Sequence, residues 1–153
     1  MARKQLKLDE FLPYRLSLAS NAVSQVLARA YESQHHLKMH EWRVLTVLAE
    51  VKQASQQQLV QLTKMDKVTI SRAARVLEKQ QLLRRITSAT DARSLELSLT
   101  PRGWDLYQRV VPTVRKLEAQ VLAGVSPREL TELKATLRRL EAAAAGVLAR
   151  QVG

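Results

Sequence analysis

The stretch from Met65 to Lys79 carries side chains that could read the edges of DNA bases. On a helical wheel its small apolar residues share one face, and they are Ile70, Ala73, Ala74 and Leu77. The opposite stripe consists of Val68, Arg72, Arg75 and Lys79. Arginine binds a guanine edge with two parallel hydrogen bonds, and a branched apolar side chain can contact the methyl group of thymine. The spacing favours a helix that enters a DNA major groove, although an ordinary solvated basic face has the same stripe.

The first turn of this predicted helix adds hydroxyl groups and a capping residue. Asp66 is expected to cap the helix, because its carboxylate can accept from the first free backbone N–H groups and suits the positive helix end. Lys67, Thr69 and Ser71 follow beside the basic stripe. Hydroxyl groups suit base edges or phosphates. All three residues are therefore candidates to read or position the major groove.

A shorter helix is predicted directly before this one. Ser55 is followed three residues later by Gln58, which is the spacing of a capping box, so a helix should begin at Gln56. Only Lys64 and Met65 are expected to connect it to the basic helix. Two short helices joined by a tight turn, the second one basic on its exposed face, are typical of a helix-turn-helix.

Beyond these helices the sequence predicts a two-stranded β-wing. The first strand should span residues 83–87 and the second residues 94–99, where apolar and polar residues alternate. Arg93 lies near the tip, and an arginine there could enter a narrow minor groove. Asp91 could orient Arg93 by a charge-assisted hydrogen bond. The first strand adds two further cations, Arg84 and Arg85.

The composition points to a polyanionic partner. Lysine and arginine outnumber aspartate and glutamate by 25 to 14, which gives a net charge of +11 and a pI near 10.6. The absence of cysteine excludes disulfides and thiolate metal sites. No apolar run is long enough to cross a bilayer and no signal-peptide pattern is present, so we expect a cytoplasmic protein without membrane partners.

The first long amphipathic helix is expected from about Pro13 to Gln34. Its apolar residues recur at helical spacing, and Leu16 and Val23 are among them. This stripe is longer than a helix packed on one small neighbour needs, which indicates a partner surface.

Two more helices are expected after the wing. Thr100 should cap the first, Pro112 should bend it by removing a backbone donor, and Gly124 should end it. Ser126 then opens a capping box for the last helix. Leucines at spacings of three and four form an apolar seam that two chains could bury together, and they are Leu130, Leu133, Leu137 and Leu140.

Three clustered histidines raise a metal-binding alternative. His35, His36 and His40 fall within six positions, and imidazole is the commonest protein ligand for zinc. His36 and His40 should straddle a loop, however, and no nearby carboxylate pair completes a ligand set. Capping or packing at a helix junction is the ordinary alternative, and we expect no metal and no cofactor.

The wing and the residues after it resemble the MarR family of winged-helix transcriptional regulators. The pattern D-x-R-x-x-x-L-x-L-T-x-x-G is present as Asp91, Arg93, Leu97, Leu99, Thr100 and Gly103. Residues 65–72 are similar to the opening of that family's recognition helix, and residues 41–45 to its preceding helix. One departure is Gln81, where the family usually has glycine, so this residue must accept an unfavourable turn or reshape it.

The resemblance implies a mostly α-helical fold with a small β-wing in a single domain over residues 1–153. A winged helix-turn-helix lobe would span residues 38–103, and dimerisation helices would span 8–36 and 104–150. It also implies a homodimer, often with a small-molecule effector bound between the dimer region and the DNA-reading lobe. By analogy an apolar crevice lined by Tyr14, Tyr31 or Trp42 would hold that effector, but core packing explains these aromatics equally well.

The sequence therefore predicts a sequence-specific, dimeric DNA-binding regulator that acts on a pseudo-palindromic operator of double-stranded DNA. We expect a repressor rather than an activator. Ser55 and Gln57 would hold phosphates, which supply affinity, while base contacts supply specificity. The alternative is a non-specific architectural DNA binder, which the charge favours and the hydroxyl-rich tip of the recognition helix disfavours. An enzyme is not expected, because the sequence shows no activated nucleophile, phosphate-cradling glycine loop or acid–base pair.

Overall fold

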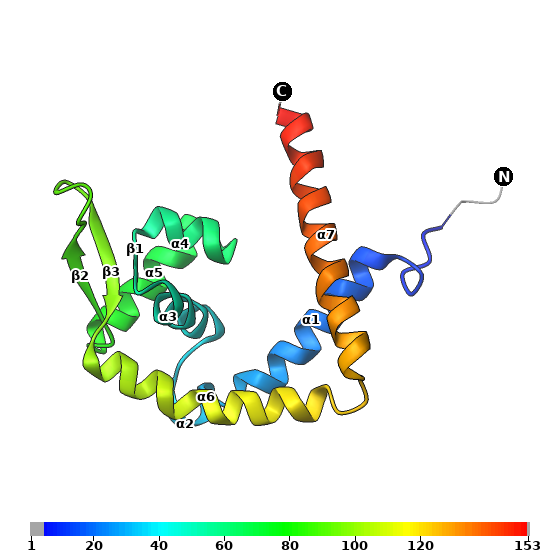
Figure 1. Ribbon diagram of the computed structural model, residues 1–153, viewed down its shortest axis with the longest axis horizontal. Helices are drawn as coiled ribbons and strands as arrows, with labels where there is room; N and C mark the ends of the chain where they lie inside the picture. The colour runs from blue at the N-terminus through cyan, green and yellow to red at the C-terminus, as the bar shows by residue number, and fades with distance from the viewer. Residues whose placement is uncertain (1–4, 153) are drawn as a thin grey trace. The chain divides into compact units, whose positions relative to one another are not determined.

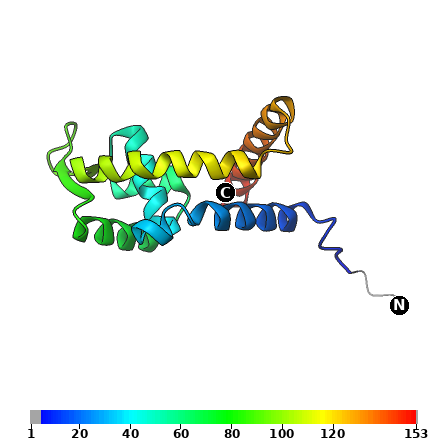
Figure 2. The same ribbon diagram turned by 90° about the horizontal axis from the view of Figure 1, so that it is seen from below.

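The computed structural model describes residues 5–152, which form seven helices and three short strands (Figures 1 and 2). In chain order they are α1 (Leu12–Ala28), α2 (Glu32–His35), α3 (Met39–Val51), β1 (Gln53–Ala54), α4 (Gln56–Thr63), α5 (Lys67–Lys79), β2 (Leu83–Thr87), β3 (Leu95–Leu99), α6 (Pro101–Val121) and α7 (Pro127–Val152). The chain divides into two compact units after Glu118. Residues 1–4 and 153, the ends of the expected single domain, lie outside the described residues.

Helices α3, α4 and α5 gather around one aliphatic core (Figure 1). Leu45 of α3, Leu59 of α4 and Leu77 of α5 are fully buried there. Burial of each such side chain stabilises the fold by about 1.5–3 kcal/mol relative to leaving it exposed. The buried residues of α5 are those that the sequence pattern predicted, Ile70, Ala73, Ala74 and Leu77. The apolar face of α5 thus holds it in the lobe and leaves its basic stripe exposed.

Both predicted caps of the helix-turn-helix are confirmed. The backbone N–H of Gln58 donates to Ser55 Oγ at 3.1 Å, and the backbone N–H of Ser55 donates to Gln58 Oε1 at 2.8 Å. The Asp66 carboxylate accepts from the backbone N–H of Thr69 at 2.8 Å. Between the helices Lys64 adopts a left-handed backbone with φ of 57°, so the chain turns at once from α4 into α5.

The wing belongs to a sheet of three strands, not two. The predicted hairpin is confirmed: β2 and β3 pair antiparallel, with Leu83 opposite Leu99 and Thr87 opposite Leu95. Strand β1 was not predicted; it pairs antiparallel with β3 and gives the order β1-β3-β2. A strand of two residues, Gln53–Ala54, is too short to show an alternating pattern. Its pairing anchors the base of the hairpin to the helix-turn-helix.

The expected long helix over 13–34 is wrong in its last six residues, because it does not continue beyond Ala28. Helix α1 ends at Ala28, and the chain turns before the four-residue helix α2. The backbone N–H groups of Ala30 and Tyr31 bond to carbonyls only three residues back, at 3.0 and 3.1 Å. This turn brings both side chains into the core, where each is 2% exposed. Tertiary burial therefore overrides a local pattern that would have continued the helix.

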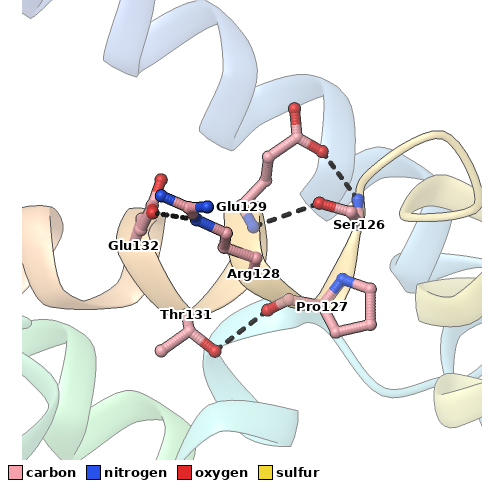
Figure 3. Close-up of polar contacts among 6 residues, drawn as sticks. All are labelled: Ser126, Pro127, Arg128, Glu129, Thr131 and Glu132. Atoms are coloured by element: carbon pink, nitrogen blue, oxygen red, sulfur yellow. Dashed lines mark hydrogen bonds and ion pairs between the residues drawn. The ribbon is translucent and has the colours of Figure 1, made fainter.

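The two helices after the wing begin at the predicted residues, Pro101 and Pro127. Helix α6 continues through Pro112 and ends at Val121, before the predicted end at Gly124. At the start of α7, Ser126 and Glu129 form the predicted capping box, with bonds of 2.8 and 3.2 Å (Figure 3). The bond from the backbone N–H of Ser126 to the Glu129 carboxylate is the main cause that lowers the pKa of this carboxyl, and the Ser126 hydroxyl acts in the same direction.

The long helices at the two chain ends bury little of their apolar surface. Neither α1 nor α7 contains a buried residue. In α1, Leu16 and Val23 are 37% and 36% exposed, and in α7, Leu133 and Leu140 are 45% and 36% exposed. Leu130 and Leu137 are half-buried. The helices of the described residues lack the combination of length and apolar character that a membrane crossing requires.

Candidate nucleic-acid interface

The outer face of α5 exposes most of the residues predicted to read DNA. Val68 is 56% exposed although it is apolar. Lys67, Arg72 and Arg75 are exposed as well, and among the described residues neither arginine takes part in an ion pair. Ser71 is half-buried beside them. The face therefore offers two free guanidinium groups, an ammonium group and a methyl-bearing side chain over the length of one helix.

Thr69 is partly committed to the helix cap. Its hydroxyl donates to Asp66 Oδ2 at 2.7 Å, in addition to the bond between its backbone N–H and the same carboxylate. The side-chain bond is the main reason that the pKa of Asp66 lies below its usual value, and the backbone bond adds to it. The hydroxyl proton of Thr69 thus points to Asp66, so its oxygen is left to accept from a partner.

The N-terminus of α4 lies close to the start of α5. Gln56, Gln57 and Val60 of α4 line a hollow of about 400 Å³ together with Lys67 of α5. The hydroxyl of Ser55 accepts the capping bond from Gln58, so its role in the free protein is to hold the helix start. The fold thus brings Gln57, a predicted phosphate contact, beside Lys67, a predicted major-groove residue, and both side chains are exposed.

The wing tip holds Arg93 in an exposed loop between β2 and β3. Asp91 does bond to Arg93, but its Oδ1 accepts from the backbone N–H at 3.0 Å, and no bond to the guanidinium is present. The carbonyl of Asp91 also accepts from the backbone N–H of Ser94 at 2.9 Å. Asp91 therefore shapes the loop that carries Arg93, while the guanidinium itself stays in solvent.

The two arginines of β2 already have protein partners. Arg84 Nε donates to Ser98 Oγ of the neighbouring strand at 3.3 Å. Arg85 donates to both carboxylate oxygens of Glu78, from Nε at 2.7 Å and from Nη2 at 3.0 Å. Glu78 was not predicted as a functional residue. Its position as the only acidic residue within the basic helix α5 could have indicated an ion pair.

Gln81 confirms the expected strain at the base of the wing. Its φ of 61° lies in the left-handed region that favours glycine. Leu82 follows, and its carbonyl accepts from the backbone N–H of Thr100 at 3.0 Å. Gly103 passes so close that a Cβ there would overlap the Leu82 carbonyl oxygen. Helix α6 is thereby fastened to the turn between α5 and β2.

A cavity of about 450 Å³ opens between the start of α3 and the side of α5. Its lining carries both apolar surface and the cations Lys38, Arg72 and Arg75, and is completed by His40, Glu41, Thr69, Ala73 and Val76. Glu41 is buried, and its Oε2 accepts from the backbone N–H of Lys38 at 2.8 Å. This cavity was not predicted from the sequence, because it depends on how α3 packs on α5; the effector crevice was expected beside Tyr14, Tyr31 or Trp42 instead.

The aromatic residues considered for an effector crevice form a stack. Tyr31 lies on Trp42 with ring centroids 5.5 Å apart, and Tyr107 lies on the other side at 5.9 Å. Trp104 meets Tyr107 edge-on at 5.9 Å. These rings join the turn after α1 to α3 and α6, so core packing accounts for Tyr31 and Trp42. Tyr14 remains 39% exposed on α1.

The histidines do not converge. His35 ends α2, His36 follows in a left-handed conformation with φ of 54°, and His40 lies in the first turn of α3. Burial is the main cause that lowers the pKa of His35, and the positive charge of Arg109 acts in the same direction. Within residues 5–152, no three histidine, aspartate or glutamate side chains gather as a metal site would require.

A helix-turn-helix followed by a β-hairpin defines a winged-helix protein, and comparison with known proteins narrows this class. The profile of the MarR family matches residues 36–94. A probable transcriptional regulator from Pseudomonas aeruginosa has a similar structure, with 30% identity, a TM-score of 0.75, and coverage of 88% of this chain and 99% of its own. The chain belongs to the MarR family, and so to transcriptional regulators rather than enzymes.

Two further solved structures share the fold. Sco3205, a MarR family regulator from Streptomyces coelicolor solved in complex with DNA, is 22% identical with a TM-score of 0.77, over 92% of this chain and 90% of its own. BpsR of Bordetella bronchiseptica, whose DNA binding is regulated by 6-hydroxynicotinic acid, is 21% identical with a TM-score of 0.80, over 90% of this chain and 98% of its own.

Proposed function

We propose that the protein is a homodimeric transcriptional repressor, acting in the cytoplasm, that binds a pseudo-palindromic operator and is released by a small-molecule effector. The observation that carries the proposal is the outer face of α5, where Arg72 and Arg75 are exposed and have no ion-pair partner among the described residues. Unpaired arginines on a capped helix match the hydrogen-bonding edges of guanine in the major groove. Repression is favoured because a protein seated on its operator excludes other proteins from that DNA.

Base readout in this proposal comes from one helix. Arg72 and Arg75 contact guanine edges, and Val68 contacts a thymine methyl group. Thr69 accepts from a base or water, because its proton is held by Asp66. Lys67 and Ser71 complete the surface.

Affinity comes from phosphate and minor-groove contacts around α5. Gln57 and Ser55 at the start of α4 face the backbone, and their peptide N–H groups lie at the positive end of that helix. Arg93 enters the adjacent minor groove from the wing tip. Arg84 adds a positive charge on β2 and links this strand to β3 through its bond to Ser98.

Dimerisation is supported by the apolar surface of α1 and of α7, each considered alone. Neither helix has a buried residue, and leucines on both are more than one-third exposed. A second copy of the chain would cover these stripes, as isologous packing does in most symmetric dimers. The dimer would place two recognition helices about one DNA turn apart, roughly 34–36 Å.

Effector release is supported by the cavity beside α5. Its volume of about 450 Å³ falls within the usual range for small-ligand sites of about 300–1,000 Å³. Arg72 and Arg75 line it, so a ligand there would compete with DNA for the same side chains. The DNA binding of the structurally similar BpsR is regulated by 6-hydroxynicotinic acid, which supports regulation of this chain by a small molecule.

The test of the proposed function is selection of binding sites from randomised DNA at one fixed salt concentration. The proposal expects enrichment of a pseudo-palindrome whose half-sites lie one helical turn apart, with random DNA a poor competitor. Non-specific binding rests on phosphate contacts alone. Equal competition by random DNA, without any enriched sequence, would contradict the proposal and indicate an architectural DNA binder.

A further inference from the structure

Glu78 and Arg85 connect the recognition helix to the wing. Glu78 lies in the last turn of α5, and Arg85 lies in the middle of β2. The guanidinium donates two hydrogen bonds to the carboxylate, at 2.7 and 3.0 Å, in the fork geometry that arginine makes best. The Glu78 side chain is 24% exposed and the Arg85 side chain 43%. The pair is therefore partly shielded, and its geometry restricts both side chains.

The pair spans the strained turn at Gln81. The chain between α5 and β2 passes through the left-handed φ of 61° at this residue, without the glycine that would adopt it freely. Thr100 holds one side of this turn, because its hydroxyl donates to the Gln81 carbonyl at 2.6 Å. The ion pair of Glu78 and Arg85 joins the helix before this turn to the strand after it. Two independent contacts thus stabilise a turn conformation that glutamine does not favour by itself.

We propose that Glu78 and Arg85 are positioning residues that fix the angle of the wing relative to the recognition helix, so that Arg85 is not a phosphate contact. This inference rests on the proposed function, because the angle matters only when α5 and Arg93 engage the same DNA. With its partner Glu78, Arg85 forms a neutral unit. A neutral unit adds little to phosphate affinity but places Arg93, whose guanidinium is free, at a defined distance from α5.

The charge of Glu78 makes the proposal testable. A carboxylate near DNA repels phosphates, so its removal alone should tighten binding if Arg85 were a phosphate contact. If the pair positions the wing, Glu78→Gln should instead weaken operator binding by about two- to fivefold, the range expected for a well-formed exposed pair. Arg85→Gln should weaken it by a similar factor, and the double variant should be no weaker than either single one.

Two further variants separate the pair from general charge effects. The exchanged variant Glu78→Arg with Arg85→Glu keeps the net charge and should recover most of the lost affinity. Arg84→Gln removes the same charge one residue away, where the partner is Ser98. Its effect should add to that of Glu78→Gln, because the two sites share no partner. Tighter or unchanged binding by Glu78→Gln would overturn the inference.

A measurement without DNA tests the same inference independently of the proposed function. The chain has no cysteine, so Gln61→Cys on α4 and Ala92→Cys at the wing tip give a unique pair of spin-label sites. Labelled chains diluted with unlabelled protein report the distance within one chain. The distance distribution should broaden in Glu78→Gln and narrow again in the exchanged variant. An unchanged distance distribution would overturn the positioning role of Glu78 and Arg85. Failure of the wild type to select any DNA sequence would overturn only the proposed function.

Discussion

The hydroxyl of Thr100 donates a 2.6 Å hydrogen bond to the carbonyl oxygen of Gln81. The same oxygen of Thr100 accepts from the backbone N–H of Gly103 at 3.0 Å, as a helix cap does. One hydroxyl group therefore starts α6 and holds the turn that leads from α5 into the wing. The stability of this junction and the geometry of the DNA-reading surface depend on the same few atoms.

Replacing Gln81 with glycine should stabilise the protein by about 0.5–1 kcal/mol. Glycine adopts the left-handed backbone that Gln81 holds at φ 61° without the clash of a Cβ, although it loses more chain entropy on folding. Urea unfolding followed by circular dichroism measures the difference. The matched control is Gln80→Gly, where φ is −81°, and glycine there should destabilise. Stabilisation by both variants, or by neither, would contradict the strain at Gln81.

Gly103→Ala should destabilise the protein by more than about 2 kcal/mol. The added methyl group overlaps the carbonyl oxygen of Leu82, which is backbone and cannot rotate away. Thermal unfolding should show the loss. Gly124→Ala serves as control, because no described residue other than its chain neighbours comes within 4 Å of its Cβ position, and its unfolding temperature should stay close to that of the wild type.

Arg72→Ala or Arg75→Ala should weaken operator binding by about 1–3 kcal/mol if the arginine makes a forked guanine contact. Each substitution should also relax the base preference at one position of each half-site. Binding to a panel of single-base operator variants measures this. A uniform loss across all sequences would reduce the arginine to a phosphate contact.

Arg93→Ala should weaken binding most on operators whose flanks are rich in A·T pairs. A narrow minor groove concentrates negative potential around an inserted cation, and the Arg93 guanidinium is free to enter it. Affinities for matched operators with A·T-rich and G·C-rich flanks give the comparison. Equal losses on both would indicate that Arg93 touches only the backbone of the DNA.

Leu137→Asp should dissociate or unfold the proposed dimer. The substitution introduces a charge into the leucine seam of α7, and burial of an unpaired carboxylate is strongly unfavourable. Sedimentation at micromolar concentration should find the wild type as a dimer and the variant as a smaller species. Ala135→Asp, exposed and away from the seam, should remain dimeric. A monomeric wild type that binds a palindromic site in a single step would contradict the dimer.

The features that the sequence predicted correctly are local. The caps at Ser55, Asp66 and Ser126 need only residues three positions away, and the wing strands need only their own alternation. The starts of the three helices that follow these caps could therefore be placed to the residue. The strain at Gln81 was predicted from the resemblance to the MarR family, in which this position is usually glycine.

The features that the sequence missed are set by contacts between distant segments. The turn at Ala30 and Tyr31 follows from their burial in the core, where Tyr31 stacks on Trp42 of α3, and β1 exists because β3 passes beside it. The bond between Glu78 and Arg85 needs β2 to fold back along α5. No spacing rule connects Glu78 with Arg85. The sequence therefore predicted the cations of the candidate site, but not that Arg84 and Arg85 already bind protein partners.

The aromatic stack gives the protein an internal optical reporter. Trp42 and Trp104 are the only tryptophans of the chain, and Tyr107 lies 5.9 Å from each. The ammonium group of Lys52 lies 4.7 Å from the centroid of the Trp104 ring. Tryptophan emission from the unmodified protein therefore comes from a single location, where α3 meets α6, and a change in the packing of these two helices can be followed there without any attached dye.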